Sequence, residues 1–171
     1  VCAGIVADEI RKSLFSLIEY DEPLKDKITY NLESNTRTGD KSDYQIDPRE
    51  RNKKALVAGA GGIGTYVALN LALSGFREID IADYDVIEES NLGRQILFYD
   101  KLGKSKSEIL AQRIREVSNA KVNGIKTRIK EDDESIFKKN KYDFVFGCFD
   151  NKEARVALNR MAINNKIIYI D

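Results

Sequence analysis

The chain has 171 residues with 28 basic and 28 acidic side chains, two cysteines and no histidine. The lack of histidine excludes Ser-His-Asp triads, Cys-His pairs and histidine metal sites, and the balanced charge argues against binding of nucleic acid. No apolar run approaches the roughly 20 residues of a membrane-spanning helix, and two cysteines form neither a disulfide framework nor a zinc site, so we expect a cytoplasmic protein without a membrane partner.

Residues 1–52 are expected to form an N-terminal helix followed by a polar arm. Apolar side chains recur at helical spacing between Ala3 and Tyr20, and Pro23 follows the end of this helix. The stretch from Lys25 to Asp47 is rich in polar turn formers, which fits a loop or an extended arm. A second domain is expected over residues 53–171. The basic cluster that leads into it is interpreted as solvated charges: Arg49, Arg51, Lys53 and Lys54.

The centre of the chain, residues 55–85, has the pattern strand, glycine loop, helix, strand and acidic end. The apolar run Ala55–Ala58 stops at Gly-Ala-Gly-Gly-Ile-Gly, residues 59–64, which fits the G-x-G-x-x-G pattern. A helix is predicted to follow, with a buried face formed by Ile63, Val67, Leu69, Leu71 and Leu73. A second short strand ends at Asp83.

Each glycine of this loop has a physical role in nucleotide binding. Gly59 permits a tight turn, Gly61 lets backbone N–H groups approach a phosphate, and Gly64 lets the helix pack close to the strand. The N-terminus of the helix adds unpaired N–H donors and the positive end of its dipole. Asp83 stands about 20 residues after the loop, where a carboxylate accepts hydrogen bonds from ribose hydroxyls. These features predict a nucleotide-binding site, with a purely structural strand-to-helix turn as the alternative.

The rest of the chain alternates between helices and strands. Residues 86–95 are too polar and irregular for a core strand. Beyond them, apolar spacing predicts helices over 105–117, 131–140 and 152–163 and strands over 121–129, 142–146 and 167–170. This favours the α/β class: a doubly wound, mainly parallel Rossmann-like sheet with helices on both faces, plus the N-terminal helical segment. Function collects beyond the carboxyl ends of such strands, so a chain that stops at Asp171 is expected to be a fragment.

Charged and amide side chains are expected to meet at this edge of the sheet, near the glycine loop: Asp83, Asn91, Arg94, Gln95, Lys106 and Asp150. Two acids, two cations and two amides suit phosphoryl chemistry, in which cations neutralise phosphate charge and a carboxylate holds Mg²⁺. Asp150 has the alternative role of capping the helix that starts near Lys152. Cys148 is interpreted as a core residue rather than a nucleophile.

These residues form a motif set that resembles the ubiquitin-activating-enzyme-like adenylating domains, the ThiF–MoeB–HesA family, which includes the molybdopterin-synthase and ThiS adenylyltransferases of sulfur-carrier pathways. The resemblance extends over about Lys53 to Asp171. Its most specific part is Ser-Asn-Leu-Gly-Arg-Gln at 90–95. It also rests on the glycine loop and on Leu73-Ser74-Gly75, Asp83–Ile87, Gly103 with Lys106, Asp150-Asn151, Arg155 and Leu158-Asn159.

The resemblance implies that the chain binds ATP and Mg²⁺. The ATP phosphates are expected on the glycine loop, at Gly59, Gly61, Gly62 and Gly64. The ribose is expected at the end of the second strand, at Asp83 with Asp85 beside it. Further contacts around the phosphates are implied for Asn91, Arg94, Gln95 and Lys106. Asp150 would coordinate the Mg²⁺, and the implied catalytic set is Arg94, Lys106 and Asp150.

The implied substrate is the C-terminal carboxylate of a small ubiquitin-like or sulfur-carrier protein, usually ending Gly-Gly. It becomes an acyl adenylate as pyrophosphate leaves. Family members often form homodimers and borrow an arginine from the partner's N-terminal region, for which Arg37, Arg49 and Arg51 are candidates here. Many members also carry Cys-x-x-Cys zinc ligands or a catalytic cysteine; this sequence has neither pattern, so zinc is expected only in a longer parent.

Two other functions are compatible with the residues. An NAD-dependent oxidoreductase fits the glycine loop and Asp83, but the sequence holds no Tyr-x-x-x-Lys pair and no histidine to transfer a proton. The third possibility is a non-catalytic nucleotide-binding or dimerisation scaffold, like the inactive half of the heterodimeric activating enzymes. The presence of Arg94, Lys106 and Asp150 argues against the scaffold, and the lack of the family's C-terminal portion argues for it.

Overall fold

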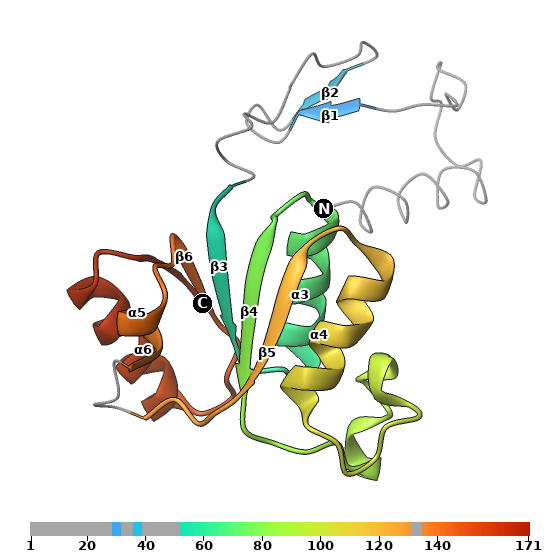
Figure 1. Ribbon diagram of the computed structural model, residues 1–171. Helices are drawn as coiled ribbons and strands as arrows, with labels where there is room; N and C mark the ends of the chain where they lie inside the picture. The colour runs from blue at the N-terminus through green and yellow to red at the C-terminus, as the bar shows by residue number, and fades with distance from the viewer. Residues whose placement is uncertain (1–28, 32–35, 39–51, 131–134) are drawn as a thin grey trace, which may run out of the picture. The chain divides into compact units, whose positions relative to one another are not determined.

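Two units make up the chain, Val1–Gln45 and Ile46–Asp171, and the computed structural model describes residues 29–31, 36–38, 52–130 and 135–171 (Figure 1). In the first unit, β1 (Thr29–Asn31) and β2 (Thr36–Thr38) pair antiparallel, where the sequence predicts a polar loop or arm. The predicted N-terminal helix, Arg49 and Arg51 lie outside the described residues.

The second unit is built on a five-stranded parallel sheet in the order β5-β4-β3-β6-β7 (Figure 1). Its strands are β3 (Lys54–Ala58), β4 (Glu78–Asp83), β5 (Lys121–Lys126), β6 (Phe144–Gly147) and β7 (Ile168–Ile170). The chain enters at the central strand β3, builds outward to β5, and then crosses back to add β6 and β7 on the other side. This doubly wound order confirms the predicted Rossmann-like fold.

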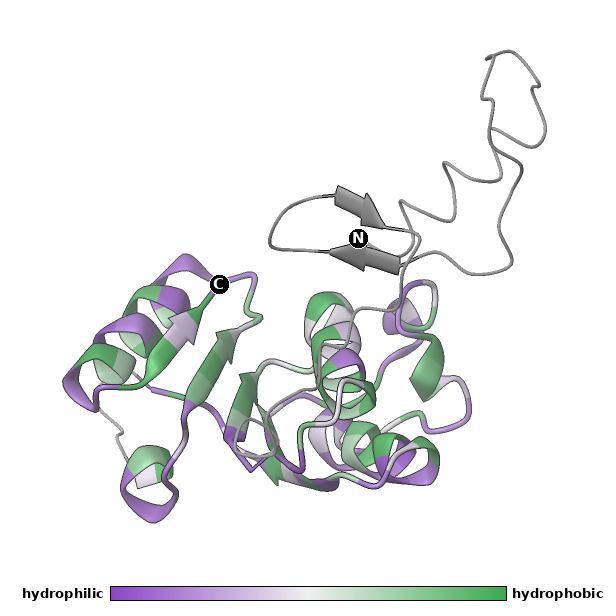
Figure 2. Ribbon diagram, turned by 90° about the horizontal axis from the view of Figure 1, so that it is seen from above, coloured by the Kyte–Doolittle hydropathy of each residue, from purple (hydrophilic) through white to green (hydrophobic). Residues whose placement is uncertain are grey.

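The helices described in this unit are α3 (Gly62–Leu73), α4 (Lys106–Val117), α5 (Ser135–Lys139) and α6 (Lys152–Asn164). Apolar residues of α3 and α4 pack with Ile79 and Ile81 in one core, and those of α5 and α6 pack with Leu56 and Ala82 in a second. Successive strand residues point to opposite faces, so β4 supplies both cores. Figure 2 shows these hydrophobic strands beside helices of mixed character. None of the described helices has the length and apolar character needed to span a bilayer.

Most predicted elements in the second unit are present with shifted ends. The helices predicted over 105–117 and 152–163 correspond to α4 and α6, and the strand 167–170 corresponds to β7. The polar run at 86–95 holds no core strand; the 3₁₀ turn Glu89–Asn91 lies within it, and a second 3₁₀ turn, Ile96–Phe98, follows it directly. The sequence therefore located the elements that frame the sheet edge.

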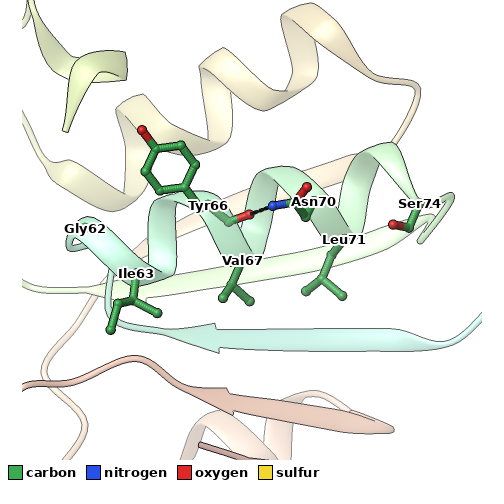
Figure 3. A pocket seen from close by; sticks show the side chains of 7 residues that line it. All are labelled: Gly62, Ile63, Tyr66, Val67, Asn70, Leu71 and Ser74. Carbon is green, nitrogen blue, oxygen red and sulfur yellow. Dashed lines mark hydrogen bonds between the residues drawn. The ribbon is translucent and has the colours of Figure 1, made fainter. Parts of the chain in front are cut away.

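The buried face of α3 differs from the predicted one. Gly64, Ala68 and Ala72 are buried, whereas Ile63 and Leu73 are 72% and 61% exposed. Small residues at a spacing of four let the helix lie close against the sheet, which leaves Ile63 and Leu73 facing outward. The other predicted residues of this face, Val67, Leu69 and Leu71, are half-buried against the core. Figure 3 shows Ile63, Val67 and Leu71 projecting from one side of α3; together with Tyr66, Asn70 and Ser74 they line a shallow surface groove.

The end of β5 also differs from the prediction, which extended this strand to Ile129. β5 pairs with β4 as far as the partners Asp83 and Lys126, where both strands stop. A strand needs a neighbour for its hydrogen bonds, and Thr127 instead donates its N–H to the Ile125 oxygen at 2.9 Å. Residues 127–129 are therefore a loop at the carboxyl edge of the sheet.

A polar cluster lies inside the second core, around the carboxylate of Asp80. This buried carboxylate lies 2.9 Å from the Lys54 ammonium and accepts hydrogen bonds of 2.7 Å from the Tyr142 hydroxyl and from the Asn123 amide. Burial, and then the bond to Asp80, raises the pKa of Tyr142 above its ordinary value. Lys54 is thus a partly buried ion-pair partner, which corrects its interpretation as a solvated charge.

Candidate functional site

A cavity of about 460 Å³ opens at the edge of the sheet where β3, β4, β5 and β6 end. Ligands of parallel α/β sheets bind at this edge. The predicted site residues that line the cavity are Gly59, Gly61, Gly62, Asp83, Asp85, Arg94, Gln95, Lys106 and Asp150. The structure does not bring Gly64 and Asn91 to the cavity wall.

The glycine loop forms one wall of the cavity. Gly59 has a positive φ of 103°, and a Cβ there would lie 2.7 Å from the Cys148 backbone oxygen. α3 begins directly after Gly61, its N-cap residue, and no side chain caps the helix there. A Cβ added at Gly61 would meet nothing within 4 Å. This arrangement leaves the first N–H groups of α3 for an anion in the cavity.

Gly64 sets the distance between α3 and the loop. A Cβ at this position would lie 1.8 Å from the Gly59 oxygen and 3.2 Å from the Cys148 Cβ. No side chain fits there without a shift of the backbone. The close packing expected of the last glycine in the loop is therefore observed, and it places this residue behind the cavity wall.

We expect Gly64→Ala to lower the free energy of unfolding by about 1–3 kcal/mol, because the added methyl group overpacks a backbone contact. Gly61→Ala is the matched control, since its methyl group meets only open space. Since Gly61 is the N-cap of α3, where Ala is less favourable than Gly, this control should cost only about 0.5–1 kcal/mol of stability, yet weaken ATP binding by filling the approach to the N-terminus of α3. Urea unfolding and titration with Mg-ATP separate the two effects. Equal unfolding midpoints for Gly64→Ala and the wild type would contradict the packing role.

Asp83 ties the glycine loop to the end of β4. Its buried carboxylate accepts hydrogen bonds from the N–H groups of Ala60 at 2.6 Å and Asp85 at 2.7 Å, one on each oxygen. These bonds tie the loop to the end of β4. The predicted contact of Asp83 with a ribose stays a prediction, in which remaining lone pairs of the same carboxylate accept the hydroxyls.

Lys106 reaches the cavity as one half of an ion pair. Its ammonium lies 3.1 Å from the Asp85 carboxylate, and its side chain is 9% exposed. The backbone strengthens this connection, because the Lys106 N–H donates to the Asp85 oxygen at 3.1 Å. Both groups line the cavity, so a bound anion would share the lysine with Asp85.

The loop after β4 places Arg94 and Gln95 at the cavity, whereas the side chain of Asn91 bonds within the loop itself. Asn91 caps its own 3₁₀ turn, where its side-chain oxygen accepts the Glu88 N–H at 3.0 Å. Arg94 is exposed and donates to the Ser90 oxygen at 3.3 Å, and its side chain passes over Gly62. Gln95 is 2% exposed.

The side-chain oxygen of Gln95 is buried without a hydrogen-bond partner among the described residues. Leaving such an acceptor unpaired costs about 1–3 kcal/mol. Since Gln95 lines the cavity, a donor from water or from a bound molecule would satisfy it.

The sequence left two roles open for Asp150, a site carboxylate and the cap of the following helix, and the structure gives the cap to Asn151. Asn151 is the N-cap of α6, and its side-chain oxygen accepts the Ala154 N–H at 3.0 Å. Asp150 is exposed and lines the cavity, and within the described ranges its carboxylate has no hydrogen-bond or ion-pair partner.

The donor set fits Mg²⁺ held together with phosphates. The described residues contain no group of three or more acidic, cysteine or histidine side chains that could hold a metal. Mg²⁺ at nucleotide sites needs only one or two carboxylates, because phosphates and water supply the other oxygens. Asp150 is a suitable single carboxylate, and the N-terminus of α3 provides the phosphate side.

Cys148 lies at the cavity wall as a partly buried thiol. Burial, and then the nearby charge of Asp171, raises the pKa of this thiol to about 11. The thiolate, which is the nucleophilic form, is therefore scarce at neutral pH. This supports its interpretation as a packing residue.

We expect the alkylation rate of Cys148 to rise with a midpoint near pH 11, about two units above the ordinary value of 9.0 for a thiol. The measurement uses iodoacetamide on a Cys2→Ser variant, with the urea-unfolded protein as the reference. The folded pKa is raised, so the stability linked to this group is present below pH 9 and is lost as pH rises towards 11. A folded-state midpoint at or below that of the unfolded chain would contradict the burial of the thiol.

Sequence reasoning missed the side of the cavity formed by Tyr84, Thr127, Arg128 and Ile129. The predicted strand had included residues 127–129. The signal for their true position was indirect: β4 ends at Asp83, and β5 loses its partner at the same level.

Comparison with protein families gives a match to the family described as the ThiF family over residues 46–171. The NEDD8-activating enzyme E1 catalytic subunit of Dictyostelium discoideum is 43% identical over 117 residues, which cover 67% of this chain and 26% of that protein. SUMO-activating enzyme subunit 2 of the same organism is 37% identical over 122 residues, covering 69% and 18% respectively. The chain thus spans about a quarter or less of the length of these relatives.

Solved structures show the same fold. The Escherichia coli tRNA N6-threonylcarbamoyladenosine dehydratase TcdA in complex with ATP superposes with a TM-score of 0.65 at 28% identity, over 70% of this chain and 50% of that one. Escherichia coli MccB with ATP gives a TM-score of 0.62 at 32% identity, over 70% and 36%. Both structures contain ATP, the ligand that the sequence predicts for this chain.

Proposed function

This chain belongs to the ThiF family, and we propose that it is the nucleotide-binding part of an adenylating enzyme. With ATP and Mg²⁺, the enzyme would convert the C-terminal carboxylate of a small ubiquitin-like or sulfur-carrier protein, ending Gly-Gly, into an acyl adenylate and release pyrophosphate. We place this domain at residues 53–171. Support comes from the relatives named as NEDD8- and SUMO-activating enzymes and from the ATP-bound structural neighbours.

The observation that carries the proposal is that the cavity combines positively charged groups with a carboxylate that has no partner among the described residues. Arg94 and the N-terminus of α3 form a positive wall, and Asp150, without a partner among the described residues, lines the same cavity. A polyanion needs cations and N–H donors, and a phosphate-bound Mg²⁺ needs a free carboxylate. The pyrophosphate of a nicotinamide cofactor would also use the N–H donors of α3, but hydride transfer requires no Mg²⁺ and no carboxylate to hold it.

In the proposed reaction, a carboxylate oxygen of the carrier attacks the α-phosphorus of ATP. A new P–O bond forms as the bond to the β-phosphate breaks, and pyrophosphate leaves with the electron pair. When bound, Mg²⁺ would neutralise phosphate charge. The N–H groups of α3 would hold the phosphates, Arg94 would offset the charge that develops during attack, and Lys106 would add a cation positioned by Asp85.

We further propose that the protein acts in the cytoplasm as a homodimer. In this arrangement an arginine from the partner's N-terminal region, residues 1–52, would reach the phosphates, and the candidates remain Arg37, Arg49 and Arg51. Any zinc ligands would belong to a longer parent protein. The carrier would be gripped mainly by parts of that parent, since the chain spans only a fraction of its relatives.

The first test is thermal unfolding with Mg-ATP and, in parallel, with NAD. A ligand at a hundred times its Kd adds about 2.7 kcal/mol of stability, which raises Tm by several degrees in a domain of this size. We expect a shift with Mg-ATP alone, followed by ATP–pyrophosphate exchange that depends on an added carrier such as NEDD8 or SUMO. A shift with NAD alone would replace the adenylating function with the oxidoreductase.

A further inference from the structure

Two cations that line the cavity differ in how they are partnered. The Lys106 ammonium lies 3.1 Å from the Asp85 carboxylate, and the lysine side chain is 9% exposed. Arg94 is exposed, and within the described ranges it has a hydrogen bond to the Ser90 oxygen but no ion pair. The full charge of Arg94 is therefore available to a ligand, whereas Asp85 cancels part of the charge of Lys106.

Backbone hydrogen bonds keep the two members of this ion pair together. The Lys106 N–H donates to the Asp85 oxygen at 3.1 Å. One step further along, the Ile87 N–H donates to the Lys104 oxygen at 2.8 Å, so the loop after β4 and the approach to α4 run antiparallel beside each other. Because both chains are fixed in this way, the carboxylate stays within reach of the ammonium when a ligand enters the cavity.

A phosphate in the cavity must share Lys106 with Asp85. An ammonium has three N–H donors, so a phosphate oxygen can bind beside the carboxylate without displacing it. Both side chains line the cavity, and the carboxylate is 45% exposed there. The carboxylate occupies one donor and offsets part of the positive charge, so the phosphate is held less tightly than it would be by an unpaired lysine.

We propose that Asp85 limits the affinity of the phosphate side of the cavity for pyrophosphate, so that this product can leave after the acyl adenylate has formed. The inference rests on the proposed function, because it takes pyrophosphate as a product of this site. Pyrophosphate has no ribose and no base, so its affinity depends on the N–H groups of α3, on Arg94 and on Lys106. Asp85 is thus a positioning residue that acts on the product through Lys106.

The test measures the affinity of the 171-residue chain for pyrophosphate and for Mg-ATP by isothermal titration. We expect Asp85→Asn to tighten pyrophosphate binding about tenfold, because the amide keeps the size of the side chain and removes one unit charge beside the lysine. A residue that only supported the fold would weaken binding when changed. Lys106→Gln should weaken pyrophosphate binding, and Asp85→Asn added to Lys106→Gln should give no gain, since the lysine through which Asp85 acts is then absent.

Glu108→Gln is the matched control, since it removes an equal charge from the first turn of α4 at an exposed position that does not line the cavity. It should leave pyrophosphate affinity within about twofold of the wild type, because water and salt screen an exposed charge. Unchanged or weaker pyrophosphate binding in Asp85→Asn would overturn the inference, while Mg-ATP binding by the wild type would leave the proposed function intact.

The double variant separates two ways in which a carboxylate can weaken anion binding. If Asp85→Asn still tightened pyrophosphate binding in the Lys106→Gln background, Asp85 would repel the anion directly, and its proposed action through the lysine would be wrong. If the wild-type chain bound neither Mg-ATP nor pyrophosphate, the proposed function itself would fail, and the inference with it.

Discussion

Asp150→Asn is expected to reduce Mg²⁺-dependent ATP–pyrophosphate exchange by at least about a hundredfold, because it removes the carboxylate proposed to hold the metal. The same variant should also lose the gain in ATP affinity that Mg²⁺ gives the wild type. Its Tm should be unchanged, since Asp150 is exposed and has no partner among the described residues, and Asn151 caps α6. The measurements are exchange rates and ATP titrations with and without Mg²⁺.

Glu153→Gln is the control for Asp150→Asn. Glu153 is an exposed acid in the first turn of α6 and does not line the cavity. It should leave exchange and Mg²⁺ dependence at wild-type levels. If Asp150→Asn retained the wild-type dependence on Mg²⁺, Asp150 would have no role in metal binding, and the metal would have to be held by phosphates and water alone.

Arg94→Ala is expected to lower kcat/KM for adenylation by an amount equivalent to about 2–4 kcal/mol of transition-state stabilisation. The guanidinium is exposed beside the start of α3 and has a hydrogen bond to the Ser90 oxygen but no ion pair within the described residues. Its charge is thus available to phosphate groups that gain charge as pyrophosphate leaves. Because the side chain is exposed, the free energy of unfolding should change by no more than about 0.5 kcal/mol.

Two further variants make the Arg94 result specific. Lys104→Ala removes an exposed cation that does not line the cavity and should keep wild-type kcat/KM. Arg94→Lys keeps the charge but loses the planar fork and should recover only part of the lost rate. A loss of tenfold or less in Arg94→Ala would demote this residue from a catalytic group to a surface cation.

The edge at which the site forms could be predicted because its signals are local in sequence. A glycine run after an apolar strand, followed by an acid at the next strand end, constrains the backbone wherever the rest of the chain lies. The alternation of strands and helices then requires a parallel sheet. Gly59, Asp83 and Asp150 were placed at one edge by these rules, and the structure has all three at the cavity.

The partners of individual side chains could not be predicted, because they depend on distances between segments far apart in the sequence. α3 buries the face that contains Gly64, because only a glycine fits so close to the loop. Ile63 and Leu73 are therefore exposed, although their apolar spacing predicts burial. The pairing of Lys106 with Asp85 joins the start of α4 to the loop after β4, 21 residues earlier in the chain. Asn151 rather than Asp150 caps α6, a choice between neighbours with nearly equal capping propensity.

The sequence by itself determined the fold class, the glycine loop and the set of charged residues at the sheet edge, since each follows from backbone constraints acting over a few residues. Only the tertiary structure decided where β5 ends, and with it the position of Arg128 over Tyr84. β5 stops where its hydrogen-bonding partner β4 stops. The length of β4 is not encoded in residues 121–129, so no local pattern there shows where β5 ends.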